Sequence, residues 1–239
     1  MTGLTGADGT AAPDAQINKD EGIKYWNSVE SDDNAMLGGV PSVGGFSYIS
    51  KVDLQGSRTF LARLGIGTKH GRQDVETALE AGAGIGRVTS GLLLNVAKQV
   101  DVIEPVAKFT AELNDNPGVR RVFTMGLEEW TATEGTQYDL IWVQWCVGHL
   151  TDEQLVEYLR RCKTVLTPEK GLIVVKENLS TSGVDYFDET DSSVTREDTK
   201  FRSLFEQAGL RLVRTDLQRG LPEKPPRRLL PLRMYALKP

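Results

Sequence analysis

A glycine-rich turn and an acidic residue one strand later are the first residues in this sequence whose types and spacing could bind a ligand. The segment "EAGAGIGR", residues 80–87, places Gly82, Gly84 and Gly86 directly after an apolar run that predicts a strand. Because glycine has no Cβ, such a turn lets backbone amides approach a ligand closely. Glu104 ends the next predicted strand, where a carboxylate can accept both hydroxyls of a ribose. For the glycines alone, a tight strand-to-helix connection is the alternative.

Arg87 narrows the class of ligand. The GxGxG spacing is followed by this arginine, where a dinucleotide-binding fingerprint requires a third Gly or Ala, so a pyrophosphate is disfavoured. Gly126, Leu127 and Glu128 follow the third predicted strand and could lay backbone against a flat base. A nucleoside without phosphates but with a carboxylate for Arg87 describes S-adenosylmethionine. The sequence therefore predicts this cofactor, with S-adenosylhomocysteine as its product.

The segment "YDLIWVQWCVGHL", residues 138–150, joins a buried strand to a polar corner. Along a strand, Trp142 and Gln144 point to one face and Trp145 to the other. Trp142 lies inside the apolar run and is predicted to be core, whereas Trp145 stands at its carboxyl edge and is predicted to be a wall of the site. His149 comes just before a predicted helix, and its distance from Trp145 favours a site role over a role in helix entry.

A second polar group is the acidic stretch "DYFDETDSSVTRED", residues 185–198. By itself such a run is usually a solvated loop. The strand end "KEN" just before it would, however, bring Asp188 and Asp191 over the carboxyl edge of the sheet. Both carboxylates are therefore candidate site residues.

The elements that must position these residues alternate from Asp74 onward. The predicted strands are 75–80, 100–104, 119–124, 139–145, 171–177, 211–217 and 232–238, and the predicted helices are 87–99, 105–115, 152–166 and 199–210. Thr151 and Gln154 have the spacing of a capping box at the start of the third of these helices. The pattern predicts an α/β fold with a mostly parallel, Rossmann-like sheet covered on both faces. In such sheets, ligands bind beyond the carboxyl ends of the strands.

The N-terminal part has a different character. Residues 1–16 predict a disordered leader, and residues 17–30 a short amphipathic helix that contains Tyr25 and Trp26. Residues 36–54 predict a glycine-punctuated loop or hairpin, and residues 57–66 a further helix. The chain length favours one domain over 17–239, with an extension over 17–72 ahead of a cofactor-binding core over 73–239.

Composition limits the partners and the compartment. Lys and Arg total 28 against 33 Asp and Glu, a net charge of −5, which disfavours nucleic acid and favours a cationic partner. Cys146 and Cys162 show no metal-ligand spacing, so no metal is expected. We expect both to be core thiols in a reducing compartment. There is no signal peptide pattern and no apolar run of about 18 residues. We expect a soluble intracellular monomer without membrane contact, in the cytoplasm and with a nuclear fraction left open.

The motifs "GAGIGR", "IWVQWCVGHL", "VVKEN" and "DETDSSVTR", in this order and spacing, resemble those of the α-N-terminal protein methyltransferases. The resemblance covers about residues 20–239 and is greatest to fungal members. These enzymes methylate the free amino terminus of proteins that begin X-Pro-Lys or X-Pro-Arg after removal of Met, and ribosomal proteins are among the expected substrates. Two departures are Val40 after "MLGG", where many members have Tyr, and Glu104, where many have Asp.

The resemblance implies a class I S-adenosylmethionine-dependent methyltransferase fold. This fold has seven strands with an antiparallel last strand, to which the family adds N-terminal helices and a hairpin that narrow the entrance. It implies a cofactor site formed by Gly82, Gly84, Arg87, Glu104, Leu127, Glu128, Gln144 and Trp26. It implies peptide contacts from Trp145, Asn178, Asp188, Ser193, Tyr25 and Leu37, with Asp191 and His149 as catalytic residues.

The methyl transfer implied by this resemblance does not need a strong base. Methyl transfer from a sulfonium needs a neutral amine in line with the S–CH3 bond, and an α-amino group with a pKa of about 7.7–8.0 loses its proton at little cost. Asp191 with His149 would orient the amine and take that proton. Asn178 would hold the backbone of the first substrate residue, and Asp188 would pair with the cationic third residue. Trp145 would pack against the proline ring.

Three alternatives stay open from the sequence. A small-molecule N-methyltransferase would not need the paired carboxylates, because a simple amine has no counterpart of the third-residue cation. An NAD(P)-dependent oxidoreductase is disfavoured by the glycine spacing and Arg87. A non-catalytic module that kept the fold would bind S-adenosylmethionine without turnover.

Overall fold

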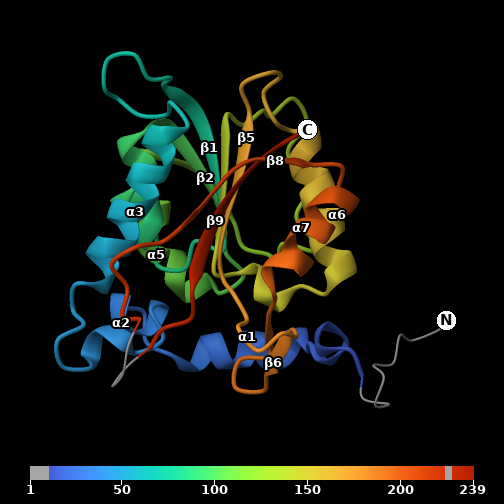
Figure 1. Cartoon of the computed structure of the whole chain (residues 1–239). Helices are drawn as coiled ribbons and strands as arrows, with labels where there is room; N and C mark the ends of the chain where they lie inside the picture. The colour runs from blue at the N-terminus through green and yellow to red at the C-terminus, as the bar shows by residue number, and fades with distance from the viewer. Residues whose placement is uncertain (1–10, 224–227) are drawn as a thin grey trace.

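The apolar runs pair into one seven-stranded sheet in the computed structural model, which describes residues 11–223 and 228–239 (Figure 1). Its strands are β1 Val75–Ala81, β2 Ala97–Ile103, β3 Val119–Phe123, β4 Leu140–Gln144, β5 Leu172–Asn178, β8 Arg211–Leu217 and β9 Leu232–Lys238. The order across the sheet is β3-β2-β1-β4-β5-β9-β8, and β9 alone runs in the direction opposite to the other six strands. The predicted, mostly parallel sheet with an antiparallel last strand is confirmed.

Helices cover both faces of this sheet. On one side lie α3 (Ile49–Arg63), α4 (Arg87–Gly91) and α5 (Ala111–Asn114), and on the other α6 (Asp152–Thr164) and α7 (Asp198–Gln207) (Figure 1). β4 shows why the strands read as continuous apolar runs. Leu140 and Trp142 belong to the core under α3, whereas Ile141 and Val143 belong to the core under α6 and α7, and all four are fully buried.

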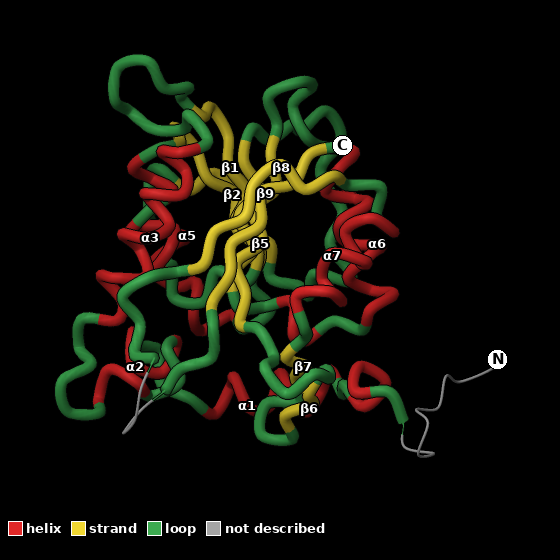
Figure 2. The backbone as a smooth tube through the Cα atoms, viewed as in Figure 1, coloured by secondary structure: helices red, strands yellow, loops and turns green. Residues whose placement is uncertain are grey.

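The carboxyl edge of the parallel strands is covered by short N-terminal and C-terminal elements. Helix α1 (Lys19–Ser28) runs along this edge beside the hairpin of β6 (Tyr186–Asp188) and β7 (Ser193–Thr195) (Figure 2). The Asn18 side chain caps α1 by accepting hydrogen bonds from the backbone N–H groups of Asp20 and Glu21. The backbone N–H of Asn18 donates to Ser192 Oγ at 2.8 Å. The strand order reverses between β1 and β4, so this edge is where a ligand site is expected.

Two predicted helices of the core are shorter than expected. The helix predicted over 87–99 ends at Gly91, a 3-10 turn follows over Leu93–Asn95, and β2 already begins at Ala97. The parallel pairing of Ala97 with Val75 extends the strand into residues whose sequence favours a helix. The helix predicted over 105–115 is divided into a 3-10 segment, Ala107–Thr110, and α5.

Of the loop or hairpin predicted over 36–54, the loop is present over residues 37–48, with a 3-10 turn at Val40–Ser42, whereas the hairpin is absent and the segment from Ile49 onward is helical. Between the short helix α2 (Asp33–Met36) and β1 the described chain contains no strand, and α3 begins at Ile49. Ile49, Asp53 and Ser57 face the interior with Phe60, and two polar side chains on that face disguise the helical period. A hairpin does stand at the carboxyl edge, but it is the one formed by β6 and β7.

The predicted disordered leader also extends too far. Residues Pro13–Gln16 form a 3-10 helix, and Asp14 Oδ2 accepts the backbone N–H of Asp152 at the start of α6, at 3.0 Å. Residues 1–10 of the predicted leader lie outside the described part of the chain.

Candidate active site

A cavity of about 240 Å³ lies at the carboxyl ends of β1, β2 and β4, beneath α1. It is the site that the strand reversal between β1 and β4 predicts. The sequence-predicted residues in its lining are Trp26, Gly82, Gly84, Arg87, Glu104, Leu127, Glu128, Gln144, Trp145 and His149. The predicted cofactor contacts, drawn from five separate segments, are thus brought together.

The glycine turn after β1 adopts a backbone that other residues resist. Gly82, Gly84 and Gly86 have φ angles of +64°, +53° and +80°. A Cβ on Gly82 would lie 2.4 Å from Cβ of Cys146, and one on Gly84 would lie 2.7 Å from Sδ of Met36. The turn therefore depends on glycine for both conformation and space.

Glu104 is fixed at the end of β2 by backbone donors. Its Oε2 accepts the N–H of Gly84 at 2.8 Å, and its Oε1 accepts the N–H of Val106 at 2.9 Å. Burial raises the pKa of Glu104, and these two donors oppose the shift. Each carboxylate oxygen still has acceptor capacity, so the predicted pairing with ribose hydroxyls fits this geometry.

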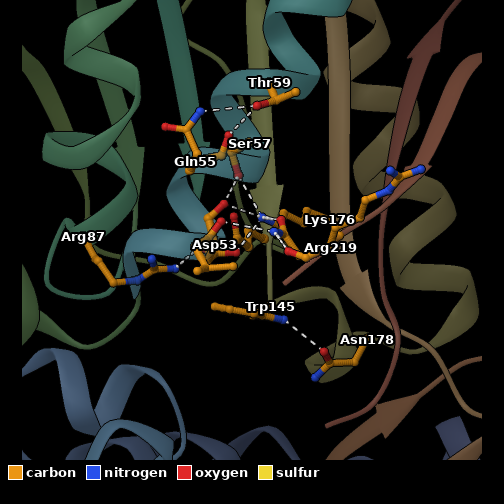
Figure 3. Close-up of polar contacts among 12 residues, drawn as sticks. Asp53, Gln55, Ser57, Thr59, Arg87, Trp145, Lys176, Asn178 and Arg219 are labelled. Atoms are coloured by element: carbon orange, nitrogen blue, oxygen red, sulfur yellow. Dashed lines mark hydrogen bonds and ion pairs between the residues drawn. The ribbon is translucent and has the colours of Figure 1, made fainter. Parts of the chain in front are cut away.

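Arg87 is held on one side only. One terminal nitrogen, Nη2, pairs with Asp53 Oδ2 at 2.8 Å, while Nη1 is buried and makes no hydrogen bond (Figure 3). The guanidinium carbon lies 5.4 Å from the centroid of the Trp145 ring. A buried donor without a partner is costly, so this side of Arg87 is suited to an anionic ligand group.

Gln144 lines the cavity, but both ends of its amide already have protein partners. Its Nε2 donates to the two carboxylate oxygens of Asp53, at 3.1 Å each, and its Oε1 accepts from Trp142 Nε1 at 3.0 Å. The polar atoms of Gln144 therefore bind the buried carboxylate first, and its predicted cofactor contact is limited to packing and spare lone pairs.

The two tryptophans of β4 and its following turn lie as predicted. Trp142 is fully buried, and Trp145 lines the cavity. Trp145 has a φ of +53°, which is strained for a residue with a side chain, and the same turn carries its Nε1 to within 3.3 Å of Asn178 Oδ1 (Figure 3). Such strain at the end of a strand is typical of a functional position.

His149 faces Trp26 and Asp191. The indole Nε1 of Trp26 donates to His149 Nε2 at 3.0 Å, so this nitrogen is an acceptor and the imidazole is neutral. Burial lowers the pKa of His149, against the opposing effects of the Asp191 charge and of a hydrogen bond with the Ser192 backbone. Asp191 Oδ1 is buried and has no hydrogen-bond partner.

The predicted peptide-binding residues lie around the cavity rather than in its lining, except for Trp145. Asn178 accepts a hydrogen bond from Trp145, which lines the cavity. Tyr25 lies in α1, where burial raises the pKa of its hydroxyl and the negative charges of Asp191 and Asp188 raise it further. Asp188 ends β6, and its Oδ1 accepts a hydrogen bond from the Thr190 N–H at 2.8 Å in the hairpin turn. Ser193 is the first residue of β7 in the same hairpin.

Leu37 does not lie in the cavity lining. It is buried at the end of α2, and its neighbour Met36 lines the cavity instead. Its predicted contact with the peptide is therefore not supported by the position of its side chain.

Sequence reasoning missed three buried ionisable residues: Asp53 and Lys176, which lie behind the cavity, and Glu80, which is part of its lining. Asp53 and Lys176 are fully buried, and their side chains pair at 2.5 Å. Glu80 accepts a hydrogen bond from Thr89, and burial raises the pKa of Glu80 to about 8, so it is protonated at neutral pH. The available signal was weak, since each of these residues is a single charge within an otherwise ordinary helix or strand pattern.

No three His, Cys, Asp or Glu side chains among residues 11–223 and 228–239 gather in a way that could hold a metal ion. Within the same described ranges, none of the helices is long and apolar enough to cross a membrane.

The family model described as AdoMet dependent proline di-methyltransferase matches residues 14–238. The chain belongs to this family. An alpha N-terminal protein methyltransferase 1 of Schizosaccharomyces pombe is 44% identical over 221 residues, which cover 92% of this chain and 95% of that relative. The N-terminal Xaa-Pro-Lys N-methyltransferase 1 of Homo sapiens is 38% identical over 205 residues, which cover 84% of this chain and 87% of that protein.

Solved structures give the same result for the fold of this AdoMet-dependent family member. A SAM-dependent methyltransferase of Leishmania major aligns with a TM-score of 0.79 and 32% identity, over 98% of this chain and 95% of that one. The 1,6-didemethyltoxoflavin-N1-methyltransferase of Burkholderia thailandensis, at 19% identity and a TM-score of 0.63, shares the fold only. The class I methyltransferase fold and the use of S-adenosylmethionine, both predicted from the sequence, are confirmed.

The residues of this AdoMet-dependent methyltransferase also fit its cofactor on structural grounds. The open side of Arg87 suits the methionyl carboxylate, and Glu104 at the end of β2 suits the ribose. Leu127 and Glu128, after β3, line the cavity where the base would lie.

Proposed function

We propose that this methyltransferase modifies the free α-amino group of proteins that begin X-Pro-Lys or X-Pro-Arg after removal of Met. The observation that carries the proposal is the carboxylate of Asp191, whose Oδ1 is buried without a partner next to His149. An acceptor in this position is suited to the N–H of an amine. The names of the relatives from Schizosaccharomyces pombe and Homo sapiens support the same class of substrate.

The cofactor side of the site would work by position. When bound, S-adenosylmethionine supplies an electrophilic methyl group on its sulfonium. Arg87 would hold the carboxylate, Glu104 the ribose, and Leu127 the base, while Trp26 covers the cavity from α1. A cofactor fixed at both ends presents its methyl group in one direction, which is what an in-line transfer requires.

The amine side would need only a weak base. Asp191 would accept a hydrogen bond from the α-amino group, orient its lone pair and take its proton. His149 already accepts the Trp26 indole N–H on Nε2, so its role in this arrangement is to fix Trp26 and to shape the neutral surroundings of the amine. We therefore assign Asp191 as the main acceptor of the α-amino proton and His149 as a secondary one.

The remaining peptide contacts follow from the residues around the cavity. Trp145 would pack against the substrate proline, and the free amide nitrogen of Asn178 would bind the backbone of the first residue. Asp188 would pair with the Lys or Arg at position three. Tyr25 and Ser193 would complete the entrance between α1 and the β6–β7 hairpin.

The biological setting belongs to the same proposal. Ribosomal proteins are proposed as substrates, and a monomer acting in the cytoplasm, and also in the nucleus, is proposed as the working form. The acidic net charge of −5 supports partners with cationic N-terminal segments.

Methylation of two hexapeptides, one beginning Ser-Pro-Lys-Arg and one Ser-Pro-Gln-Arg, tests the assignment by mass spectrometry and steady-state kinetics. Asp191→Asn keeps the size of the side chain but loses its charge, so kcat should fall on the order of 10²–10⁴-fold while cofactor affinity is unchanged. Asp188→Asn should mainly raise KM, and more for the Lys peptide than for the Gln peptide.

Raising the pH to about 9 should partly restore the activity of Asp191→Asn, because more of the α-amino group is then neutral. Equal and modest losses for both variants on both peptides would contradict the separate roles. Methylation of small amines but of neither peptide would point to a small-molecule methyltransferase instead.

A further inference from the structure

A buried cluster of charges links helix α3 to the cavity. Asp53 of α3 lies at its centre, and the side chains of Arg87 and Lys176 pair with its carboxylate (Figure 3). The Gln144 amide donates to the same carboxylate, so three other elements meet at Asp53. Asp53 and Lys176 are fully buried and do not line the cavity, whereas Arg87 and Gln144 do. Asp53 and Lys176 therefore do not contact a ligand in the cavity, and Arg87 and Gln144 are the residues that connect them to it.

Lys176 is bound on every side by protein groups. Besides the Asp53 carboxylate, its Nζ contacts the carbonyl oxygen of Asp53 at 3.0 Å, Ser57 Oγ at 2.8 Å and Gln218 Oε1 at 3.0 Å. Burial lowers the pKa of Lys176 to about 8, so the ammonium keeps its charge at neutral pH. This lysine is thus a fixed positive charge with no donor left for a ligand.

The charges of the cluster do not cancel. Two cations, Arg87 and Lys176, share the single anion Asp53, whose pKa stays below its ordinary value because their charges outweigh the effect of burial. Glu80 does not supply the missing negative charge, since it is protonated at neutral pH. The cluster therefore holds one surplus positive charge, and Nη1 of Arg87 is a buried donor without a partner.

Stability alone gives little reason for such an arrangement, because a buried ion pair is often no more stabilising than apolar residues of similar volume. A role in ligand binding explains it better. Asp53 alone would orient Arg87 but also neutralise it, which would weaken its attraction for a carboxylate. Lys176 offsets the charge of Asp53, so Arg87 is both oriented and electrostatically available.

We infer that Asp53 and Lys176 are positioning residues for Arg87, which they hold in place and keep positively charged toward the carboxylate of the cofactor. The inference rests on the proposed role of Arg87 in the cofactor site. It adds that α3 and β5, neither of which supplies the carboxylate contact, determine its strength. It predicts that Lys176 matters only for ligands that carry the carboxylate.

Binding of two ligands by isothermal titration calorimetry tests this. S-adenosylhomocysteine has the amino-acid carboxylate, and 5′-methylthioadenosine has the same nucleoside and thioether without it. In Lys176→Met the affinity for S-adenosylhomocysteine should fall about tenfold or more, while the affinity for 5′-methylthioadenosine should change by less than about threefold. Lys176→Gln removes the charge but keeps a polar donor, and it serves if the Met variant does not fold.

Arg87→Met sets the reference, because it should show the same selectivity between the two ligands. In the double variant Arg87→Met/Lys176→Met the losses should not add, since Lys176 acts through Arg87. Arg120→Met is the matched control. It removes another cation from a buried carboxylate, Asp101, whose Oδ2 lies 2.6 Å from Arg120 Nη2 outside the cavity, and it should leave the ligand selectivity unchanged.

Equal weakening of both ligands in the Lys176 variants, or no weakening of either, would overturn the inference and leave the cluster a purely structural one. If the unaltered enzyme methylates neither peptide, but the Lys176 variants still lose affinity for S-adenosylhomocysteine alone, the proposed substrate is overturned and the positioning role is not. An Arg87→Met variant without selectivity would remove both Arg87 and its supports from the cofactor site.

Discussion

Burial favours the neutral form of the His149 imidazole, and one hydrogen bond matches that form. Trp26 lies in α1 and His149 lies 123 residues later in the chain, yet the indole N–H donates to Nε2 at 3.0 Å. Protonation of Nε2 would break this bond and place two N–H groups against each other. The low pKa that burial gives His149 is consistent with this contact.

Trp26→Phe should therefore raise the pKa of His149. The phenyl ring keeps an aromatic side chain at the site but has no N–H, so Nε2 becomes free to bind a proton, and the Asp191 charge favours this. The two histidines of the chain can be followed together by NMR titration of their ring resonances. His70, the other histidine, is exposed in the loop between α3 and β1 and takes no part in this contact. An unchanged His149 titration in Trp26→Phe would mean that the indole contact does not control its protonation.

At the scale of single elements, α6 shows how a local sequence signal defines a helix start. Thr151 accepts the N–H of Gln154, and the Gln154 side chain accepts the N–H of Thr151, which is a complete capping box. Asp14 from the N-terminal 3-10 helix accepts the next N–H, that of Asp152. The start of α6 thus also anchors the segment that leads into α1.

Thr151→Ala should lower the free energy of unfolding by about 1 kcal/mol, because an N-cap hydroxyl that satisfies a helix N–H is lost. Urea unfolding followed by circular dichroism measures this. Thr164→Ala is the matched control, since Thr164 ends the same helix and its hydroxyl only donates to a carbonyl one turn earlier. This control should change stability by less than about 0.5 kcal/mol. Similar losses in the two variants would argue against a specific contribution of the cap.

At the scale of the whole molecule, the protein buries two carboxyl groups, Glu80 and Glu177, for which the cost of burial outweighs the charge of a nearby arginine. Burial raises the pKa of both Glu80 and Glu177 to about 8. The folded protein therefore holds protons on these two groups at pH values where the unfolded chain has released them. The stabilisation is complete below the ordinary carboxyl pKa and is lost as the pH rises through about 8.

Between pH 6.5 and 8 the free energy of unfolding should consequently fall, by about 1 kcal/mol per pH unit for each of the two carboxyl groups. Two groups oppose this fall: His149, whose pKa is lowered from 6.5, at the lower end of the window, and Lys176, whose pKa is lowered to about 8, toward its upper end. Glu80→Gln and Glu177→Gln should each flatten the dependence, since an amide does not titrate. Glu76→Gln, at an exposed carboxylate of β1, is the control and should retain the slope. Equal slopes in all these proteins would show that the buried carboxyls do not titrate with folding.

Much of this molecule follows from local sequence patterns. The strands were predictable because burial on both faces gives them apolar runs, as in residues 140–143 of β4 and 172–175 of β5. The glycine turn was predictable because positive φ angles and close approaches exclude side chains there. Glu104 and Arg87 could be placed at one cofactor site because parallel strands bring their carboxyl ends to a common edge.

The sequence by itself thus determined the sheet, the turn after β1 and the residues at the carboxyl edge, because each is specified by neighbours along the chain. Only the tertiary structure decided which buried charges balance one another. Asp53 and Lys176 are 123 residues apart, and in the sequence each resembles a surface charge on a helix or strand. A charge can be buried only if its partners are present, and those partners come from other elements. The start of α3, the orientation of Arg87 and the neutral state of His149 therefore become visible only when the chain is folded.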